Sequence, residues 1–184
     1  VALVPQPVDH VRIHVFLIAS GIVAHGVALK PGKPICLASH HGKPIVVLPG
    51  FPTSAIFTFH EFVAPIIRRM ADVPFEPRST VRARLAVKIN SEIGRTEYIL
   101  VGLVKTDETP AGQPDVPYAA FPMGKGSGSV TTFSRADGFV KIDRHEEIVP
   151  TNSIVDVQML GQGLQVADLV VIGSHCVGLD YLLS

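Results

Sequence analysis

The sequence has little cysteine, no excess of charge of either sign and no long hydrophobic segment. Its two cysteines, Cys36 and Cys176, lie far apart within apolar segments, a pattern that is typical of buried free thiols in a reducing compartment and not of a disulfide framework. Sixteen basic residues balance sixteen acidic ones, so the composition carries no signature of non-specific nucleic-acid binding. No apolar segment approaches the roughly 20 residues that cross a bilayer. We therefore expect no nucleic-acid partner and no membrane span.

Targeting signals and repeats are missing as well. The chain begins at Val1 without the basic segment of a secretory signal, so we expect a cytoplasmic protein. No internal repeat or low-complexity tract is visible. What the sequence does have is 47% apolar residues over 184 positions, enough for the cores of one or two domains. Its 16 glycines and 15 prolines predict many turns between short elements.

The first part of the chain alternates short apolar segments with turns. Residues 15–24 fit either the end of a helix or a buried strand, and we favour a helix that closes at Gly21, followed by a strand over 22–27. Residues 35–38 and 44–48 predict a hairpin around the turn at 40–43.

A helix is predicted to begin at Pro52. Apolar residues keep helical spacing from Ile56 to Met70, which predicts a buried face that packs on the preceding sheet. Pro65 lies inside this pattern and predicts a kink or a restart of the helix, because proline has no N–H to donate.

The pattern changes after the proline-rich segment 73–78. Apolar and polar residues alternate over 81–89, which is typical of a strand with one solvent-exposed face. Further strands are predicted over 98–104, 118–121, 138–142 and 154–160. Short strands with intervening turns favour a small β-barrel or sandwich, in which the glycine-rich loop 124–129 allows a ligand to approach the backbone closely.

These changes divide the sequence into three parts. We expect an α/β domain over 1–77, an all-β barrel domain over 78–165, and the start of a further α/β domain over 166–184. The third expectation rests on a buried-type strand that ends in a Gly-Ser turn at 173–174. The chain is accordingly expected to be a piece of a larger protein.

The segment from His25 to Pro52 has the features of an anion site. Lys30 and Lys33 stand among prolines and a glycine, so their ammonium groups are expected to project from a stiff loop. Close by, a strand breaks and a helix begins at a turn that contains Pro49, Gly50 and Pro52. Cationic side chains and free N–H groups near one place favour an anion. Ser54 fits either a helix N-cap or a ligand contact.

The same segment resembles a known family. It reads His-Gly-Val-Ala-Leu-Lys-Pro-Gly-Lys-Pro over 25–34, then Gly-Lys-Pro at 42–44 and Leu-Pro-Gly-x-Pro-x-Ser-Ala at 48–55. This is similar to the MoeA family, the molybdopterin molybdotransferases of molybdenum-cofactor biosynthesis, and the similarity extends over about 23–160. It implies an α/β fold class for 1–77, a truncated MogA-like αβα substrate domain, followed by a small all-β barrel domain. The last segment resembles the start of a periplasmic-binding-protein-like domain.

The resemblance also implies a chemistry. It implies insertion of molybdate into adenylylated molybdopterin with release of AMP, with Mg²⁺ held mostly by residues outside this chain. It implies a homodimer and a possible MogA-type partner. The catalytic residues would be Lys30 and Lys33, no metal ligand is assigned, and the substrate-binding residues would be Pro49, Gly50, Pro52, Ser54, Arg95, Lys125 and Ser127.

The sequence departs from the family in ways that leave alternatives open. The family has asparagine where Phe51 stands, and the acidic loop that precedes this block and handles Mg²⁺ and nucleotide is not visible. We expect a fragment that is incomplete for catalysis. The alternatives are a non-catalytic sensor that binds molybdate or molybdopterin, and a scaffold for MogA-type partners.

Each candidate residue also has an ordinary structural interpretation. The two lysines fit a solvated loop, Arg95 a surface arginine, and Ser127 a tight turn. His40 and His41 fit a solvated turn better than a metal site, because no cysteine or carboxylate lies at ligand spacing.

Overall fold

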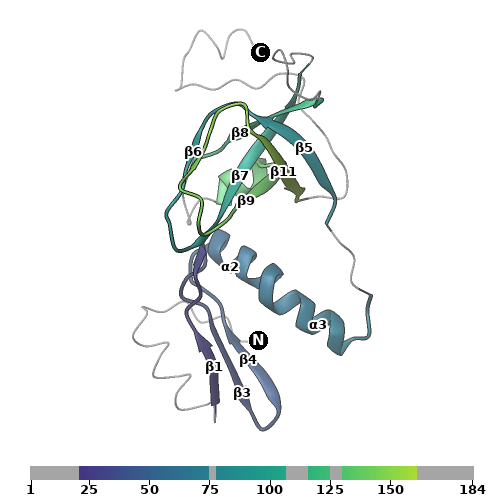
Figure 1. The fold of residues 1–184 in the computed structure, drawn as a ribbon. Helices are drawn as coiled ribbons and strands as arrows, with labels where there is room; N and C mark the ends of the chain where they lie inside the picture. Colours follow the sequence, from purple (N-terminus) through teal and green to yellow (C-terminus); the bar gives the residue numbers. More distant parts are fainter. Residues whose placement is uncertain (1–20, 75–77, 107–115, 125–129, 161–184) are drawn as a thin grey trace.

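A computed structural model describes residues 21–74, 78–106, 116–124 and 130–160 of the chain. Within these ranges a three-stranded sheet is followed by a helical segment and then by a β-barrel (Figure 1). The predicted helix that closes at Gly21, the third domain over 166–184 and the loop residues Lys125 and Ser127 lie outside the described residues. The division between 77 and 78 also stays a prediction, because residues 75–77 are not described.

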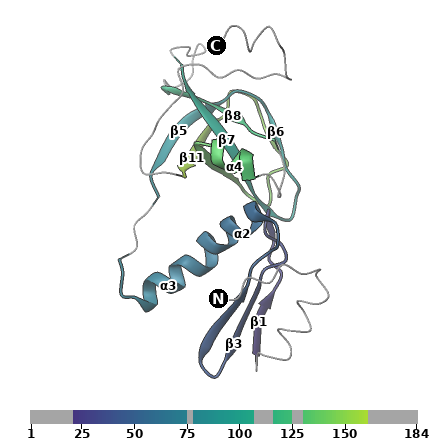
Figure 2. The ribbon, with the colours of Figure 1, turned by 180° about the vertical axis from the view of Figure 1, so that it is seen from behind.

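The three-stranded sheet has the order β1-β3-β4 and is antiparallel throughout. Its strands are β1 (Gly21–His25), β3 (Cys36–His40) and β4 (Lys43–Val47). His41 and Gly42 form the turn between β3 and β4 with φ of 47° and 73°. Positive φ at both positions is the conformation that matches the twist of a two-residue hairpin. The predicted hairpin is therefore confirmed, and in both views its sheet extends away from the barrel (Figures 1 and 2).

The helix begins at Pro52, as predicted, and changes its winding before Pro65. It consists of α2 (Pro52–Thr58), a π-helical turn (Phe59–Val63) and α3 (Ala64–Met70). Wider π-type winding accommodates a position where the regular hydrogen-bond ladder is interrupted, and proline interrupts it. The predicted kink or restart thus takes the form of a π-helical turn directly before α3.

The predicted buried face of this helix is wrong over its second half. Ile67 and Met70 are 45% and 70% exposed, and α3 contains no buried residue. The buried side chains lie in α2, namely Thr53, Ser54, Phe57 and Thr58. The reason is that α2 lies against the barrel, whereas α3 extends away from it (Figure 2).

The sequence predicts a small β-barrel or a sandwich, and the structure is a barrel closed by five strands. They are β5 (Thr80–Leu85), β7 (Thr96–Lys105), β8 (Tyr118–Pro122), β9 (Gly138–Ile142) and β11 (Ile154–Met159). The hydrogen-bonded order is β7-β8-β5-β11-β9, and β9 pairs back onto β7. Closure removes free sheet edges. The interior holds a core of buried apolar residues that includes Leu85, Val101, Leu103, Ile142 and Val157.

Several short elements lie outside the five strands of the barrel. β2 (Leu29–Lys30) runs parallel to the start of β7, and β6 (Ile89–Asn90) pairs with β10 (Ile148–Val149) in a separate ribbon. The single strand predicted over 81–89 is therefore wrong: β5 ends at Leu85, and the amide of Ala86 donates to the carbonyl of Ala120 in the neighbouring strand β8. The short helix α4 (Val130–Arg135) is not predicted by the sequence pattern.

Aromatic side chains join the helix to the outside of the barrel. The ring of Phe57 in α2 stacks on that of Tyr98, with centroids 5.1 Å apart and planes 8° from parallel, and meets the ring of Phe139 edge-on at 5.1 Å. Phe133 of α4 adds a further edge contact at 5.9 Å. Such pairs stabilise a contact beyond the area that they bury. This cluster fixes α2, and with it the loop before β3, against the start of β7.

Candidate functional site

The loop that carries the two predicted lysines packs against α2. It connects β2 to β3, and its conformation depends on Gly32, which has φ of 127°. A Cβ at this position would overlap the Cγ2 atom of Thr58 and lie 3.4 Å from Cδ2 of Leu29. The amide of Ile35 also donates to the carbonyl of Gly32 at 3.3 Å. Only glycine allows the loop to lie this close to the helix.

Lys30 is held by two carboxylates that sequence reasoning missed. Its Nζ donates to Oε1 of Glu92 at 2.7 Å and lies 3.4 Å from Oε1 of Glu97. Strand pairing explains the second contact, because β2 and β7 place Lys30 opposite Glu97. The pKa of Lys30 is raised, chiefly by the hydrogen bond to Glu92 and also by the charge of Glu97, against the opposing effect of burial. The ammonium therefore does not project freely from the loop.

The two carboxylates differ in their surroundings. The Glu97 side chain is 3% exposed, and its Oε2 accepts a hydrogen bond from Oγ of Ser91 at 2.9 Å. Glu92 is 55% exposed, and its Oε2 lies 3.5 Å from Nη1 of Arg95. A signal for this arrangement is present in the sequence, where the carboxylates flank the Gly94-Arg95 turn that precedes β7, but the pairing with Lys30 depends on contacts 62 residues apart.

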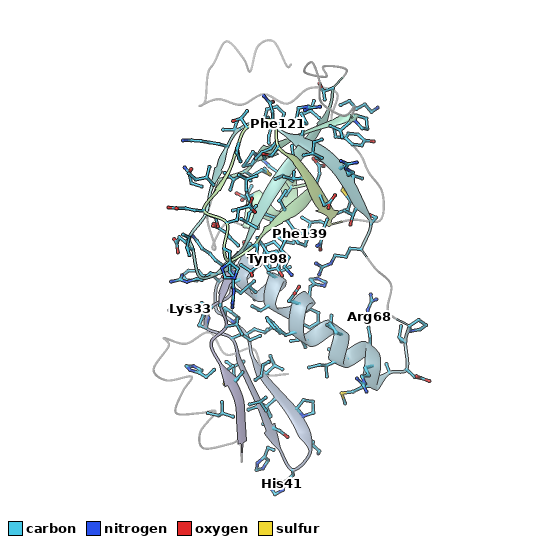
Figure 3. The ribbon with its side chains drawn as sticks, in the orientation of Figure 1. Lys33, His41, Arg68, Tyr98, Phe121 and Phe139 are labelled. Carbon is cyan, nitrogen blue, oxygen red and sulfur yellow. The ribbon has the colours of Figure 1, made fainter. Side chains whose placement is uncertain are left out.

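Lys33 has a different environment from Lys30. Its side chain is exposed and has no charged partner among the described residues, while its carbonyl accepts a hydrogen bond from the amide of Val27 at 2.9 Å. Figure 3 shows Lys33 at the junction between the three-stranded sheet and the barrel, near Tyr98. The backbone of this residue is fixed and its ammonium is available to a ligand.

The turn before α2 brings only some of the predicted residues to the site. Phe51 is the N-cap residue, with extended backbone and no side-chain capping bond, so the N-cap interpretation of Ser54 is wrong. Ser54 is buried in the first turn, where its carbonyl accepts a hydrogen bond from Oγ1 of Thr58 at 2.7 Å. Phe51 is 61% exposed although it is a large aromatic residue.

A cavity of about 350 Å³ lies between the loop, the start of α2 and the start of β7. Four predicted site residues line it: Lys30, Lys33, Ser54 and Arg95. Its wall also contains Glu97 and several apolar or aromatic residues, which are Leu29, Phe51, Phe57, Tyr98, Ile99, Leu100 and Met123. Pro49, Gly50 and Pro52 are not among the lining residues. Gly124, which directly precedes the predicted loop residues Lys125 and Ser127, is part of the lining.

The cavity combines two chemistries. Cations and carboxylates lie at the end where the loop meets the Gly94-Arg95 turn, and apolar side chains form the rest of the wall. Tyr98 belongs to the apolar part: burial, followed by the nearby carboxylate of Glu61, raises the pKa of its phenol well above the usual range. The arrangement suits a ligand that has an anionic group and an apolar or planar body.

Metal ligands are sparse in the described part of the chain. No group of three or more His, Cys, Asp or Glu side chains lies close enough there to hold a metal ion. The rings of His40 and His41 meet edge-on with centroids 4.1 Å apart at the hairpin turn, away from the cavity. None of the helices formed by the described residues is long and apolar enough to span a bilayer.

Comparison with known proteins matches both parts of the chain. Residues 82–160 match the MoeA C-terminal region (domain IV), and residues 10–69 match a probable molybdopterin binding domain. A putative molybdopterin biosynthesis protein of Methanocaldococcus jannaschii is 25% identical over 76% of this chain and 30% of its own length. Molybdopterin molybdenumtransferase 1 of Mycobacterium tuberculosis is 30% identical over 74% of this chain and 32% of its own length.

Solved structures match as well. The crystal structure of the molybdopterin biosynthesis moeA protein from Pyrococcus horikoshii superimposes with a TM-score of 0.64 at 30% identity, over 84% of this chain and 36% of that one. The matches confirm the predicted fold class, a MogA-like α/β part followed by a small β-barrel. The chain spans about a third of the length of these two curated relatives.

Proposed function

The chain belongs to the MoeA family of molybdenum-cofactor biosynthesis proteins, and on that premise we propose that its cavity is the oxyanion-holding part of a molybdotransferase site. Its ligands would be molybdate and the anionic portion of adenylylated molybdopterin. The observation that carries the proposal is the convergence of Lys30, Lys33 and Arg95 on one cavity from segments 65 residues apart in the chain (95 minus 30). Fixed cations around a developing oxyanion are an effective means of stabilising a transition state.

Each part of the cavity has a role in this proposal. The ammonium of Lys33 and the guanidinium of Arg95 bind the oxyanion, and Arg95 can do so with two parallel N–H groups. Because the backbone around Lys33 is fixed by the contact between Gly32 and α2, little conformational freedom is lost on binding. Phe51 and Met123 line the apolar part of the cavity, where they would hold a planar ring and exclude water from the anionic end.

The Mg²⁺ that the family resemblance implies does not fit the described residues. Magnesium requires an octahedral set of oxygen ligands, and the two carboxylates near the cavity, Glu92 and Glu97, are both paired with Lys30. Within the described ranges no third carboxylate, histidine or cysteine completes a cluster with them. We therefore assign no Mg²⁺ ligand among the residues that the structure describes.

Binding of molybdate tests the proposal directly. Lys33→Ala is expected to weaken molybdate binding about tenfold or more, because a hydrogen bond to a charged group is lost, and to leave the melting temperature unchanged. Lys43→Ala is the matched control, since Lys43 is an exposed lysine at the tip of the hairpin and does not line the cavity. Equal molybdate affinity of the parent chain and Lys33→Ala in calorimetry would refute the proposal.

A second assay separates the enzyme from the alternative sensor. Adenylylated molybdopterin is mixed with the chain, molybdate is added, and AMP is followed over time. Continuous release of AMP supports a molybdotransferase. Stoichiometric binding without AMP supports a molybdate or molybdopterin sensor, the alternative that Phe51 at the family's asparagine position suggests.

A homodimer, a MogA-type partner and a cytoplasmic location belong to the same proposal and rest on the family resemblance. Light scattering over a range of protein concentrations tests the homodimer, and the mass of a single chain at every concentration would contradict it.

A further inference from the structure

Glu92 occupies the donors that an oxyanion ligand would use. One oxygen of its carboxylate accepts from Nζ of Lys30 at 2.7 Å, and the other lies 3.5 Å from Nη1 of Arg95. Both cations line the cavity. A carboxylate that spans two cations presents two terminal oxygens and a negative charge, which are also the features of a phosphate or molybdate edge. Bound ligand and Glu92 therefore compete for the same two groups.

Glu97 is not a second competitor. Its side chain is buried, its Oε2 accepts from Ser91, and its backbone is paired with β2 directly opposite Lys30. Moving this carboxylate would leave a buried charge and disturb the barrel. Glu92, in contrast, lies in the segment between β6 and β7 and is more than half exposed. Rotation of its side chain into solvent therefore costs much less than moving Glu97.

The net charge of the side chains around Glu92 determines how strongly the cavity attracts an anion. Lys30 and Arg95 contribute two positive charges, and Glu92 and Glu97 contribute two negative ones, so the four side chains are neutral as a group. An anion that arrives at this group gains a net attraction only after Glu92 turns away. Lys33, which has no charged partner among the described residues, is the cation that attracts the ligand first.

We propose that Glu92 is a displaceable internal anion that sets the affinity of the cavity for tetrahedral oxyanions. Without ligand it bridges Lys30 and Arg95; when a ligand binds, it swings out and releases both cations to the ligand. This inference rests on the proposed function of the cavity, and it adds a specificity-determining residue that weakens binding. Free molybdate, inorganic phosphate and the phosphate group of a nucleotide share the required chemistry.

Removing the charge of Glu92 tests the inference. Glu92→Gln keeps the shape of the side chain and is expected to bind molybdate about tenfold more tightly than the parent chain at low ionic strength, because a unit charge within roughly 5 Å of the ligand is lost. Asp72→Asn is the matched control: it removes one negative charge from an exposed residue after α3, at the far end of the helix from the barrel (Figure 1). Its affinity is expected to equal that of the parent.

A double-mutant cycle distinguishes displacement from a general charge effect. In the parent, Arg95→Ala removes a ligand contact but also loosens Glu92, so the two effects partly cancel. In the Glu92→Gln background only the loss remains, and Arg95→Ala is expected to weaken molybdate binding several-fold more. Additive effects of the two substitutions would overturn the displacement mechanism. Parallel titrations with phosphate and with AMP show whether the tighter binding extends to inorganic phosphate and to a nucleotide phosphate or is confined to molybdate.

Failure of this inference is distinguishable from failure of the proposed function. If Lys33→Ala weakens molybdate binding and Glu92→Gln leaves it unchanged, the cavity is an oxyanion site and Glu92 is not its competitor. If neither the parent nor Glu92→Gln binds molybdate, phosphate or AMP while both remain folded by circular dichroism, both proposals are overturned.

Discussion

Replacing Gly32 by alanine is expected to damage the candidate site through the backbone of the lysine loop. The φ of 127° at this residue lies in a region that is nearly exclusive to glycine, and forcing another residue into it costs about 1 to 3 kcal/mol. The added Cβ would also overlap Cγ2 of Thr58, a fully buried residue of α2. Such overpacking costs a further 1 to 3 kcal/mol, roughly. We expect Gly32→Ala to lower the free energy of unfolding by about 2 to 6 kcal/mol.

The two parts of this cost are separable with a second substitution. Thr58→Ser removes the Cγ2 methyl and keeps the hydroxyl that donates to the carbonyl of Ser54. Alone it is expected to cost about 1 kcal/mol, the value of one buried methyl group. In the Thr58→Ser background the steric part of the Gly32→Ala cost disappears, and the backbone strain of about 1 to 3 kcal/mol remains. The two substitutions are therefore expected to be non-additive by the steric part, about 1 to 3 kcal/mol.

Urea unfolding followed by far-UV circular dichroism measures all four corners of this cycle. Gly50→Ala is the control, because a Cβ at Gly50 meets nothing within 4 Å. The reasoning is refuted if Gly32→Ala is as stable as Gly50→Ala, or if its cost is the same with and without Thr58→Ser. Molybdate titrations of the same variants show whether the displaced loop also loses its ligand.

Three further predictions concern the contacts around the cavity. Phe57→Ala is expected to lower the free energy of unfolding by about 3 to 5 kcal/mol, because it removes the central ring of the cluster that joins α2 to the barrel; a loss below about 1 kcal/mol in urea unfolding would contradict that packing. Glu97→Gln is expected to lower the free energy of unfolding by about 1 to 3 kcal/mol, because it removes the charge of a buried ion-pair partner of Lys30. The loss stays in this range because Lys30 is a third exposed, so water partly screens the pair. The pKa of Lys30 is raised above its ordinary value of 10.5 in the folded chain. The stability that its charge contributes is therefore complete below pH 10.5 and is lost as the pH rises through the folded-state pKa. Above pH 10.5 the parent chain should lose more stability than Glu97→Gln does. Burial raises the pKa of the Cys36 thiol, so in a Cys176→Ser background a thiol reagent is expected to label the folded chain much more slowly than the urea-unfolded chain, and equal labelling rates would disprove burial.

The hairpin and the start of the helix are specified by local sequence. The turn residues His41 and Gly42 suit the positive φ that a two-residue connection needs, and Pro52 is favourable at the first position of a helix. The predicted strand at 154–160 likewise shows a period of two, because burial alternates along β11 with one buried face. Because these signals act between neighbours along the chain, they are readable without the fold. The alternation predicted from residue 81 is not kept in β5, where Ala83, Arg84 and Leu85 are all buried.

Other features of the fold have no local signal. The exposed second half of the helix is apolar at helical spacing, and only the absence of a covering element among the described residues distinguishes it from a buried face. The end of β5 at Leu85 is set by two hydrogen bonds: the amide of Leu85 donates to the carbonyl of Ser153, and the amide of Ala86 donates to the carbonyl of Ala120. Both depend on partners that lie far away in the sequence.

The candidate site shows the same division. By itself the sequence determined which cations stand in a constrained loop, Lys30 and Lys33, because prolines and a glycine restrict the chain locally. Only the tertiary structure decided that their environments differ, since the pairing of β2 with β7 places Lys30 against Glu97 and within reach of Glu92, while Lys33 faces the cavity without a charged partner among the described residues. The sign of a side chain's charge is a property of the residue itself. The net charge that a ligand meets in the cavity depends on the neighbours that strand register brings together.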